Sequence, residues 1–289
     1  MMRNFMHPTE SHNCSSPRRF LMTLVLGIVA FSAGCAKPAA GDGGTSTTSP
    51  VSDPNYKFAT GNWVFSATAP GGTFATLSGF VDEQGGDPGT NDFTTAAMQA
   101  QSSSCYSSSP ILSFEGTVTN TTVSLTSFTE EGQVMTISAT KNAAANAVTG
   151  TYSVSGGCAN GASGAFSGVL YQPLNGTYSS AVSSASPTPS VQLTLAQATQ
   201  GDGSGISFLS GSASFQNISC FTGGTVSSPG SYVLGNRVSL SVRANDSAGS
   251  QILAAGIFDA AGDTITFPSI AIVSGSCVGS FGPATLTLQ

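Results

Sequence analysis

Apolar and polar side chains alternate along most of the chain from about residue 61 onward. Over residues 62–69, the alternation places Trp63, Phe65 and Ala67 on one face. A period of two is typical of β-strands that bury one face, and the abundance of Val and Thr favours strands too. In the first half of this region we predict strands over 62–69, 73–81, 93–101, 111–118, 122–128, 133–140, 147–155 and 163–171.

The second half of the region continues the same pattern of short alternating runs separated by turn residues. The clearest runs cover 191–196, 206–215, 237–243, 251–258 and 264–273. No convincing helix is predicted after the N-terminal segment. The spacing predicts about eight short strands per half, which is typical of an all-β fold with two antiparallel barrels or sandwiches.

The two halves also repeat each other in sequence. At a constant offset, Gly61, Phe93 and Cys105 match residues of the second half, and after a small insertion Cys158 does so as well. A Ser- and Gly-rich chain gives some chance matches, but it does not place both cysteines and their neighbours in step. We therefore predict two tandem β domains, residues 61–173 and 174–289. The matched positions of the second half are Gly176, Phe208, Cys220 and Cys277.

Four cysteines lie within these predicted domains, and four cysteines permit three pairings. The repeat selects one of them, with Cys105 joined to Cys158 and Cys220 joined to Cys277. A four-cysteine metal site is the alternative, but it would need C-x-x-C spacing, which is absent. Each predicted disulfide closes a loop long enough to stabilise its domain by about 4 kcal/mol.

The N-terminus has the layout of a secretory signal peptide. Arg18 and Arg19 precede an apolar stretch of twelve residues, 20–31, and small residues follow at 32–34. A membrane-spanning helix needs about 20 apolar residues, so this stretch predicts a cleaved signal over 1–34 rather than a span. Residues 36–60 are rich in Ser, Thr, Gly, Pro and Ala, and we interpret 35–60 as the new N-terminus and a flexible tether.

The cleavage region Ser32-Ala33-Gly34-Cys35 resembles the lipobox of bacterial lipoproteins. The resemblance implies that Cys35 is diacylated and anchors the chain to a membrane. Ser32 stands where the family usually has Leu, so ordinary cleavage that leaves Cys35 as a free thiol is the alternative. Arg18 and Arg19 also faintly resemble a twin-arginine signal. Because Ala36 is not the Asp linked to inner-membrane retention, the outer membrane is favoured where the host has one.

The end of the first half supplies a second resemblance. The run from Gly150 to Cys158, followed by Gly161, Gly164 and Phe166, resembles uncharacterised bacterial lipoprotein repeats with β-meanders, and loosely resembles small lipocalin-like barrels. The pattern also includes the Gly-x-Trp opening at Gly61. The second half departs from it because it lacks Trp and has Ser276 in place of the second Gly. The resemblance implies a β-meander fold and carries no activity, and a fold by itself does not give a function.

Charged and catalytic residues are scarce. The two histidines, His7 and His12, lie in the predicted signal, so a processed chain has no Ser-His or Cys-His site. No phosphate loop or dinucleotide fingerprint is present. The net charge is −6 and the basic residues do not cluster, so we expect no nucleic-acid partner.

Carboxylates and aromatic residues are the remaining candidates for a site. Four carboxylates lie in one Gly- and Pro-rich stretch, which we interpret first as a solvated acidic loop, with Ca²⁺ binding or a glycosidase pair as alternatives. Five aromatic side chains would suit a sugar-stacking patch, although core packing is favoured for Trp63 and packing against the disulfides for Tyr106 and Phe221. The carboxylates are Asp82, Glu83, Asp87 and Asp92, and the aromatics are Trp63, Tyr106, Tyr152, Tyr171 and Phe221.

Three hypotheses about function follow. The first is a non-enzymatic, membrane-anchored binding or adhesion module of the cell envelope, whose partner is a glycan or an envelope protein. The second is a lipocalin-like carrier of a small apolar ligand. The third, an enzyme acting on envelope glycans, is the least favoured. No cofactor is expected apart from the Ca²⁺ alternative.

Overall fold

The computed structural model describes residues 59–68, 76–84, 92–101, 103, 105–106, 111–180, 189–199, 203–275 and 277–289. The predicted signal peptide, Cys35 and the predicted tether up to residue 58 lie outside these residues. All described residues belong to one compact unit, Pro50–Gln289. Among them, no helix is long and apolar enough to cross a membrane.

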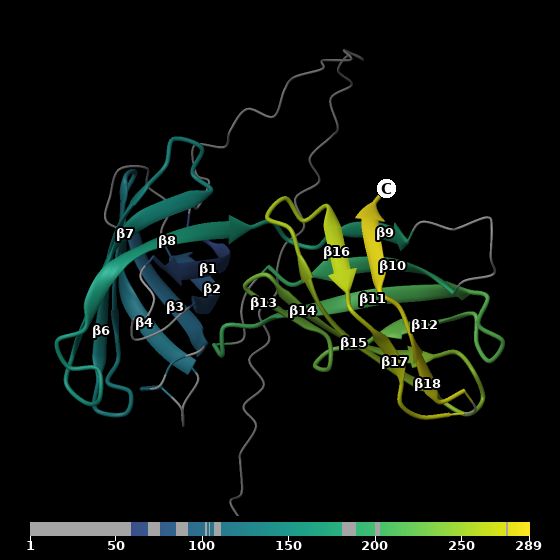
Figure 1. Ribbon diagram of the computed structural model, residues 1–289. Coiled ribbons are helices and arrows are strands. Elements are labelled where there is room, and N and C mark those ends of the chain that lie inside the picture. Colours follow the sequence, from purple (N-terminus) through teal and green to yellow (C-terminus); the bar gives the residue numbers. More distant parts are fainter. Residues whose placement is uncertain are drawn as a thin grey trace, which may run out of the picture. The chain divides into compact units, whose positions relative to one another are not determined.

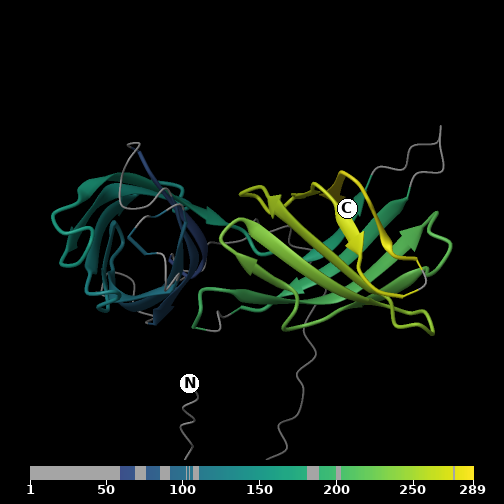
Figure 2. The ribbon, with the colours of Figure 1, turned by 60° about the horizontal axis from the view of Figure 1, so that its bottom comes forward.

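The first half of the described chain forms a closed antiparallel barrel (Figure 1). Each strand pairs with the next along the chain, and β8 pairs with β1 to close the ring, which Figure 2 shows nearly end-on. A complete ring leaves no unpaired edge strand. The strands are β1 (Gly61–Ala67), β2 (Thr76–Gln84), β3 (Asp92–Gln101), β4 (Ile111–Val118), β5 (Thr122–Ser127), β6 (Val134–Lys141), β7 (Ala147–Ser155) and β8 (Ser163–Tyr171).

The interior of this barrel is filled by side chains. In β5, Val123 and Leu125 are buried while Thr122, Ser124 and Thr126 are exposed, as the period of two predicts. Trp63 and Phe65 point inward from β1, and their rings pack 5.7 Å apart. An eight-stranded barrel has an interior just wide enough for side chains to fill, so the predicted core position of Trp63 is confirmed.

The second half forms a second closed barrel of the same design, in which three of the eight wall positions are split into two short strands. β14 pairs with β15, and β19 pairs with β9. The strands are β9 (Gly176–Ser180), β10 (Ser190–Gln197), β11 (Ser207–Gln216), β12 (Gly223–Val226), β13 (Tyr232–Leu234), β14 (Arg237–Ala244), β15 (Gln251–Phe258), β16 (Thr264–Phe267), β17 (Ile270–Ile272), β18 (Gly279–Phe281) and β19 (Ala284–Leu288).

A proline lies at each of the three splits in the second barrel. Pro229 separates β12 from β13, Pro268 separates β16 from β17, and Pro283 separates β18 from β19. Proline has no backbone N–H to donate to a strand ladder. The continuous strand predicted over 264–273 is therefore wrong at its centre, where Pro268 and Ser269 leave the sheet.

In both barrels, the residues that precede the first strand are held across one end of the barrel by the same set of hydrogen bonds. In the first barrel, the N–H of Ala59 donates to Oε2 of the buried Glu83 at 2.7 Å, and the N–H of Glu83 donates to Oγ1 of Thr60. Trp63 Nε1 donates to the Ala59 carbonyl at 2.7 Å. The chain therefore crosses this end of the barrel before β1 begins, and the last residues of β2 hold it there.

The second barrel repeats this arrangement with different side chains. The N–H of Leu174 donates to Oε1 of Gln197 at 3.0 Å, and the N–H of Gln197 donates to Oδ1 of Asn175. Tyr178 is buried like Trp63 and donates its hydroxyl to the carbonyl of Gly262. Tyr178 therefore takes the place of the tryptophan that the second half lacks.

Both predicted disulfides are confirmed, and each crosses the other end of its barrel. Cys105 lies between β3 and β4 and Cys158 between β7 and β8, which are opposite gaps in the ring. Their Cα atoms are 5.5 Å apart, so both loops fold inward over the opening. Cys220, between β11 and β12, and Cys277, between β17 and β18, are joined in the same way with a Cα separation of 6.1 Å.

Gln133 supports the crosslink of the first barrel from the turn between β5 and β6. Its side chain is buried; Nε2 donates to the Cys105 carbonyl at 2.8 Å, and Oε1 accepts from the Ala159 N–H at 2.9 Å. The predicted turn at Glu131 and Gly132 is confirmed, because both residues have positive φ values of 52° and 76°. One amide thus bridges the two loops that the disulfide joins.

Alkaline pH is expected to destabilise this end of the first barrel through Tyr106. Burial, and secondly the charge of Glu131, raise the pKa of Tyr106 to about 12, whereas an unfolded tyrosine titrates near 10. Below about pH 10 both states keep the proton and stability is unaffected; between about pH 10 and 12 only the unfolded state loses it, so stability falls. Urea midpoints measured across this window will show the fall.

The variant Tyr106→Phe provides the control for this prediction. The Tyr106 hydroxyl makes no hydrogen bond with a described residue, so its removal leaves no partner unsatisfied. The variant should keep the wild-type midpoint at neutral pH and lose less stability above pH 10. An identical alkaline loss in both proteins would show that Tyr106 does not titrate as described.

Candidate functional site

The residues singled out as candidate metal ligands do not gather into a site in the part of the chain that the structure describes. Asp82 and Glu83 are neighbours on β2 and therefore point to opposite faces. Asp82 is on the outer wall, whereas Glu83 is buried and accepts a hydrogen bond from the Ala59 N–H. Asp87, like the side chain of Asp92, lies outside the described residues, so the Ca²⁺ alternative stays a prediction.

The acidic loop itself is shorter than the sequence predicted. Asp82 and Glu83 are still within β2, and Asp92 already begins β3. The two strands remain paired over this stretch, since Asp82 lies opposite Thr95. No group of three or more His, Cys, Asp or Glu residues among the described residues could hold a metal ion.

The five aromatic residues considered for a sugar-stacking patch do not form one. Four of them, Trp63, Tyr106, Tyr152 and Phe221, are buried, the first three in one barrel core and Phe221 in the other. Tyr171 is half-buried and packs edge-on against Phe258, with the ring centroids 5.5 Å apart. Period-two alternation directs Trp63 and Tyr152 inward. Tyr106 and Phe221 lie outside the strands, next to Cys105 and Cys220, and their expected packing in the cores beside the disulfides is confirmed.

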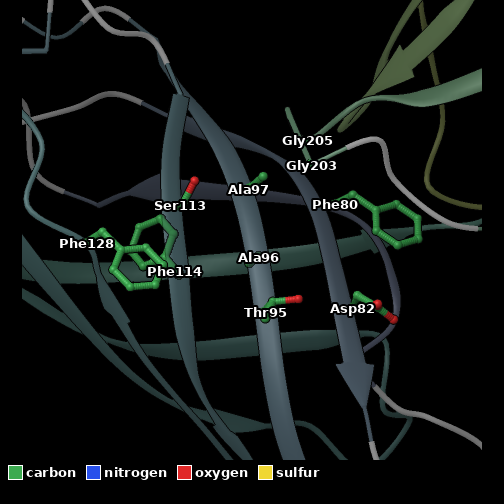
Figure 3. Close-up of a pocket in the computed structure, with 10 residues that line it drawn as sticks. All are labelled: Phe80, Asp82, Thr95, Ala96, Ala97, Ser113, Phe114, Phe128, Gly203 and Gly205. Carbon is green, nitrogen blue, oxygen red and sulfur yellow. The ribbon is translucent and has the colours of Figure 1, made fainter. Parts of the chain in front are cut away.

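A hollow on the outer wall of the first barrel is the best candidate for a binding site (Figure 3). Phe80 on β2, Ala97 on β3 and Ser113 on β4 lie in one row across the wall. Phe128 continues this row, because its N–H donates to the Ser113 carbonyl at 2.9 Å. The small side chains of Ala97 and Ser113 thus form the floor between two aromatic rings.

Polar groups lie beside this floor. Asp82 and Thr95 are opposite each other in the next row of the wall, and both line the hollow. Figure 3 shows oxygen atoms of Asp82, Thr95 and Ser113 around the floor, with Phe80 and Phe128 on opposite sides of it. Gly203 and Gly205, two residues with positive φ, also line the hollow.

The hollow is small and open to one side, with a volume of about 240 Å³. Drug-sized ligands usually occupy about 300–1,000 Å³, so this hollow suits one ring of a larger ligand. Phe128 is 55% exposed, the second most exposed large apolar side chain among the described residues. An exposed ring next to a carboxylate and two hydroxyls can bind a group that is apolar on one face and hydroxylated on its rim.

Sequence reasoning did not identify this hollow, although part of the signal was present. Val123 and Leu125 face inward, so Ser127 does as well and Phe128 must face outward. An outward phenylalanine at the end of the predicted strand 122–128 could therefore have been identified from the sequence. Its neighbours on the wall depend on strand pairing, which the alternation does not give.

No family model, no curated protein and no solved structure matches this chain.

Proposed function

We propose that this chain is an exported, membrane-anchored lipoprotein that binds a glycan of the cell envelope without catalysis, using the hollow on the first barrel. The hollow is the observation that carries the proposal. The faces of sugar rings carry C–H groups that pack on aromatic rings, and their hydroxyls hydrogen-bond to carboxylates and hydroxyls. Phe128 and Asp82 supply these groups, and the buried Phe80 closes one side of the hollow.

The disulfides and the signal-like N-terminus support the proposed location. Disulfides persist in oxidising compartments outside the cytoplasm, and both barrels have one across an end. The lipobox resemblance implies that acyl chains on Cys35 form the anchor. Residues 36–60 would act as a flexible tether between the membrane and the barrels. The outer membrane is favoured because the residue after Cys35 is Ala36 and not the Asp linked to inner-membrane retention.

The two alternative functions have less support. A carrier of an apolar ligand would need space inside a barrel, but both interiors contain a contiguous cluster of buried side chains. A glycan hydrolase uses a pair of carboxylates on either side of the bond. Among the residues that line the hollow, Asp82 is the one carboxylate.

The variants Phe128→Ala and Asp82→Asn test the proposed site. Each should weaken binding of solubilised peptidoglycan fragments by about 2 kcal/mol, roughly thirtyfold in Kd, measured by titration calorimetry. Val169→Ala is the matched control, since Val169 is an exposed apolar residue on β8 of the same barrel. Unchanged affinity in both hollow variants, or product release from the fragments, would contradict the proposal.

A further inference from the structure

The outer wall of the second barrel carries an exposed apolar strip along β15. Ile252 and Phe258 point into the core, whereas Leu253, Ala255 and Ile257 face outward. Ile257 is 54% exposed and Leu253 is 39% exposed. Exposed apolar side chains that adjoin one another indicate an interaction surface more strongly than single ones do.

The strip extends onto the neighbouring strand. Ala271 on β17 lies opposite Leu253, and Val273, which is 44% exposed, donates its N–H to the Gln251 carbonyl. These outward apolar residues therefore cover adjacent wall positions. We call Leu253, Ala255, Ile257, Ala271 and Val273 together the β15 face.

Two arginines lie beside the β15 face on the strand at its other side. In the register of β14 with β15, Arg237 is opposite Ile257 and Arg243 is opposite Gln251. Both side chains are exposed, and neither guanidinium forms an ion pair with a described residue. The other outward residues of β14 and β15 are Ser239, Ser241, Gln251, Leu253, Ala255 and Ile257, so no carboxylate lies among them.

Three carboxylates lie in the turns at the two ends of β15, namely Asp246, Asp259 and Asp263. Asp246 accepts hydrogen bonds from the backbone N–H and the hydroxyl of Ser250. Asp259 accepts the N–H groups of Asp263 and Thr264. The carboxylates therefore lie at the two ends of β15, and none of the three forms an ion pair with Arg237 or Arg243, whose side chains are exposed along the wall.

The first barrel shows that the fold does not require such a wall. Its strands β5 and β6 occupy the positions that β14 and β15 occupy in the second barrel. Their exposed residues are all Thr and Ser: Thr122, Ser124, Thr126, Thr136, Ser138 and Thr140. The second barrel therefore has apolar and arginine residues at wall positions where the first has hydroxyl residues, in a chain of net charge −6.

We propose that the β15 face docks on a membrane surface that contains anionic phospholipid. Arg237 and Arg243 are six residues apart, about 20 Å along an extended strand, so each reaches a different headgroup. Guanidinium groups bind phosphate oxygens in a bidentate geometry. Leu253 and Ile257 between them would enter the boundary between headgroups and acyl chains, as apolar faces of peripheral proteins do.

Vesicle co-sedimentation tests this proposal with the unlipidated chain 36–289, which contains every described residue. The chain should bind phosphatidylcholine vesicles that contain phosphatidylglycerol more tightly than phosphatidylcholine alone, and salt should weaken the binding. A basic residue near an anionic surface contributes about fivefold in affinity, so Arg237→Gln with Arg243→Gln should cost about thirtyfold. Leu253→Thr with Ile257→Thr, which copies the first barrel, should also reduce binding.

Two substitutions in the first barrel are the matched controls. Lys141→Gln removes the third described cation, and Val169→Thr removes an exposed apolar residue. Both should leave vesicle binding unchanged, and all variants should keep the wild-type melting temperature. Equal affinity for the two vesicle types, or equal losses in the control variants, would overturn the proposal.

A separate outcome would assign the β15 face to another occupant. If the unlipidated chain forms oligomers in solution, and Leu253→Thr with Ile257→Thr makes it monomeric without changing vesicle binding, the face contacts a second copy of the chain. Sedimentation velocity without vesicles distinguishes this result. The membrane proposal would then be wrong, whereas glycan binding at the hollow would be untouched.

Discussion

Replacing Cys105 and Cys158 together by serine is expected to lower the free energy of unfolding of the first barrel by about 4 kcal/mol. The disulfide joins residues that are 53 positions apart, and closing a loop of that size removes entropy from the unfolded chain. Small domains are stable by only about 5–15 kcal/mol, so the loss is a large share. Urea unfolding followed by the fluorescence of Trp63, the one tryptophan, reports on this barrel.

The second barrel supplies the control for that experiment. Replacing Cys220 and Cys277 should leave the Trp63 transition close to wild type, since that tryptophan lies in the core of the first barrel. Circular dichroism should then show a separate early transition. A Trp63 midpoint that is unchanged without Cys105 and Cys158 would mean that the loops and Gln133 hold the end of the barrel by themselves.

Replacing Cys35 by serine is expected to abolish acylation and to make any remaining membrane association sensitive to salt. A diacylated cysteine buries two acyl chains, each of which contributes about 0.8 kcal/mol per buried CH₂, and no other lipid attachment is predicted. Cell fractionation and labelling with radioactive palmitate measure the effect. Cys14→Ser is the matched control, because Cys14 lies in the predicted signal peptide and its loss should change neither label nor fraction.

The same experiment decides between the two interpretations of Cys35. A wild-type chain that takes up no palmitate would favour ordinary cleavage with a free thiol. Any membrane association that remains in the Cys35→Ser variant and disappears at high salt would come from the β15 face, since charge contacts with phosphate are screened by salt.

The architecture could be predicted because the alternation of apolar and polar residues is a local pattern, and because the two repeats constrain each other. Most strand positions and both disulfide pairs agree with the structure, and Trp63 and Phe65 face the core as expected. The duplication made the pairing of Cys105 predictable, since a crosslink in one copy must have a counterpart in the other. The choice between a barrel and a sandwich depends on the pairing of β1 with β8, a long-range contact that periodicity does not predict.

The candidate sites were harder to predict for the same reason. Asp82 and Glu83 looked like loop residues because Gly and Pro follow them, but pairing with β3 keeps both in the sheet. Phe80 and Phe128 are 48 residues apart in sequence, and they flank one hollow because β2, β3 and β4 are neighbours. The prolines at 268 and 283 were visible, yet the predicted strand over 264–273 ran through the first of them.

The position of the disulfides has a consequence for how an exported chain would cross a membrane. Each one connects opposite sides of a ring that can only be completed once the last strand has joined the first. While the thiols stay reduced, neither ring gains the stabilisation of its crosslink, and the polypeptide is easier to thread as an extended chain through a narrow secretion channel. Oxidation after passage would then make folding effectively one-way, because each crosslink stabilises its completed ring.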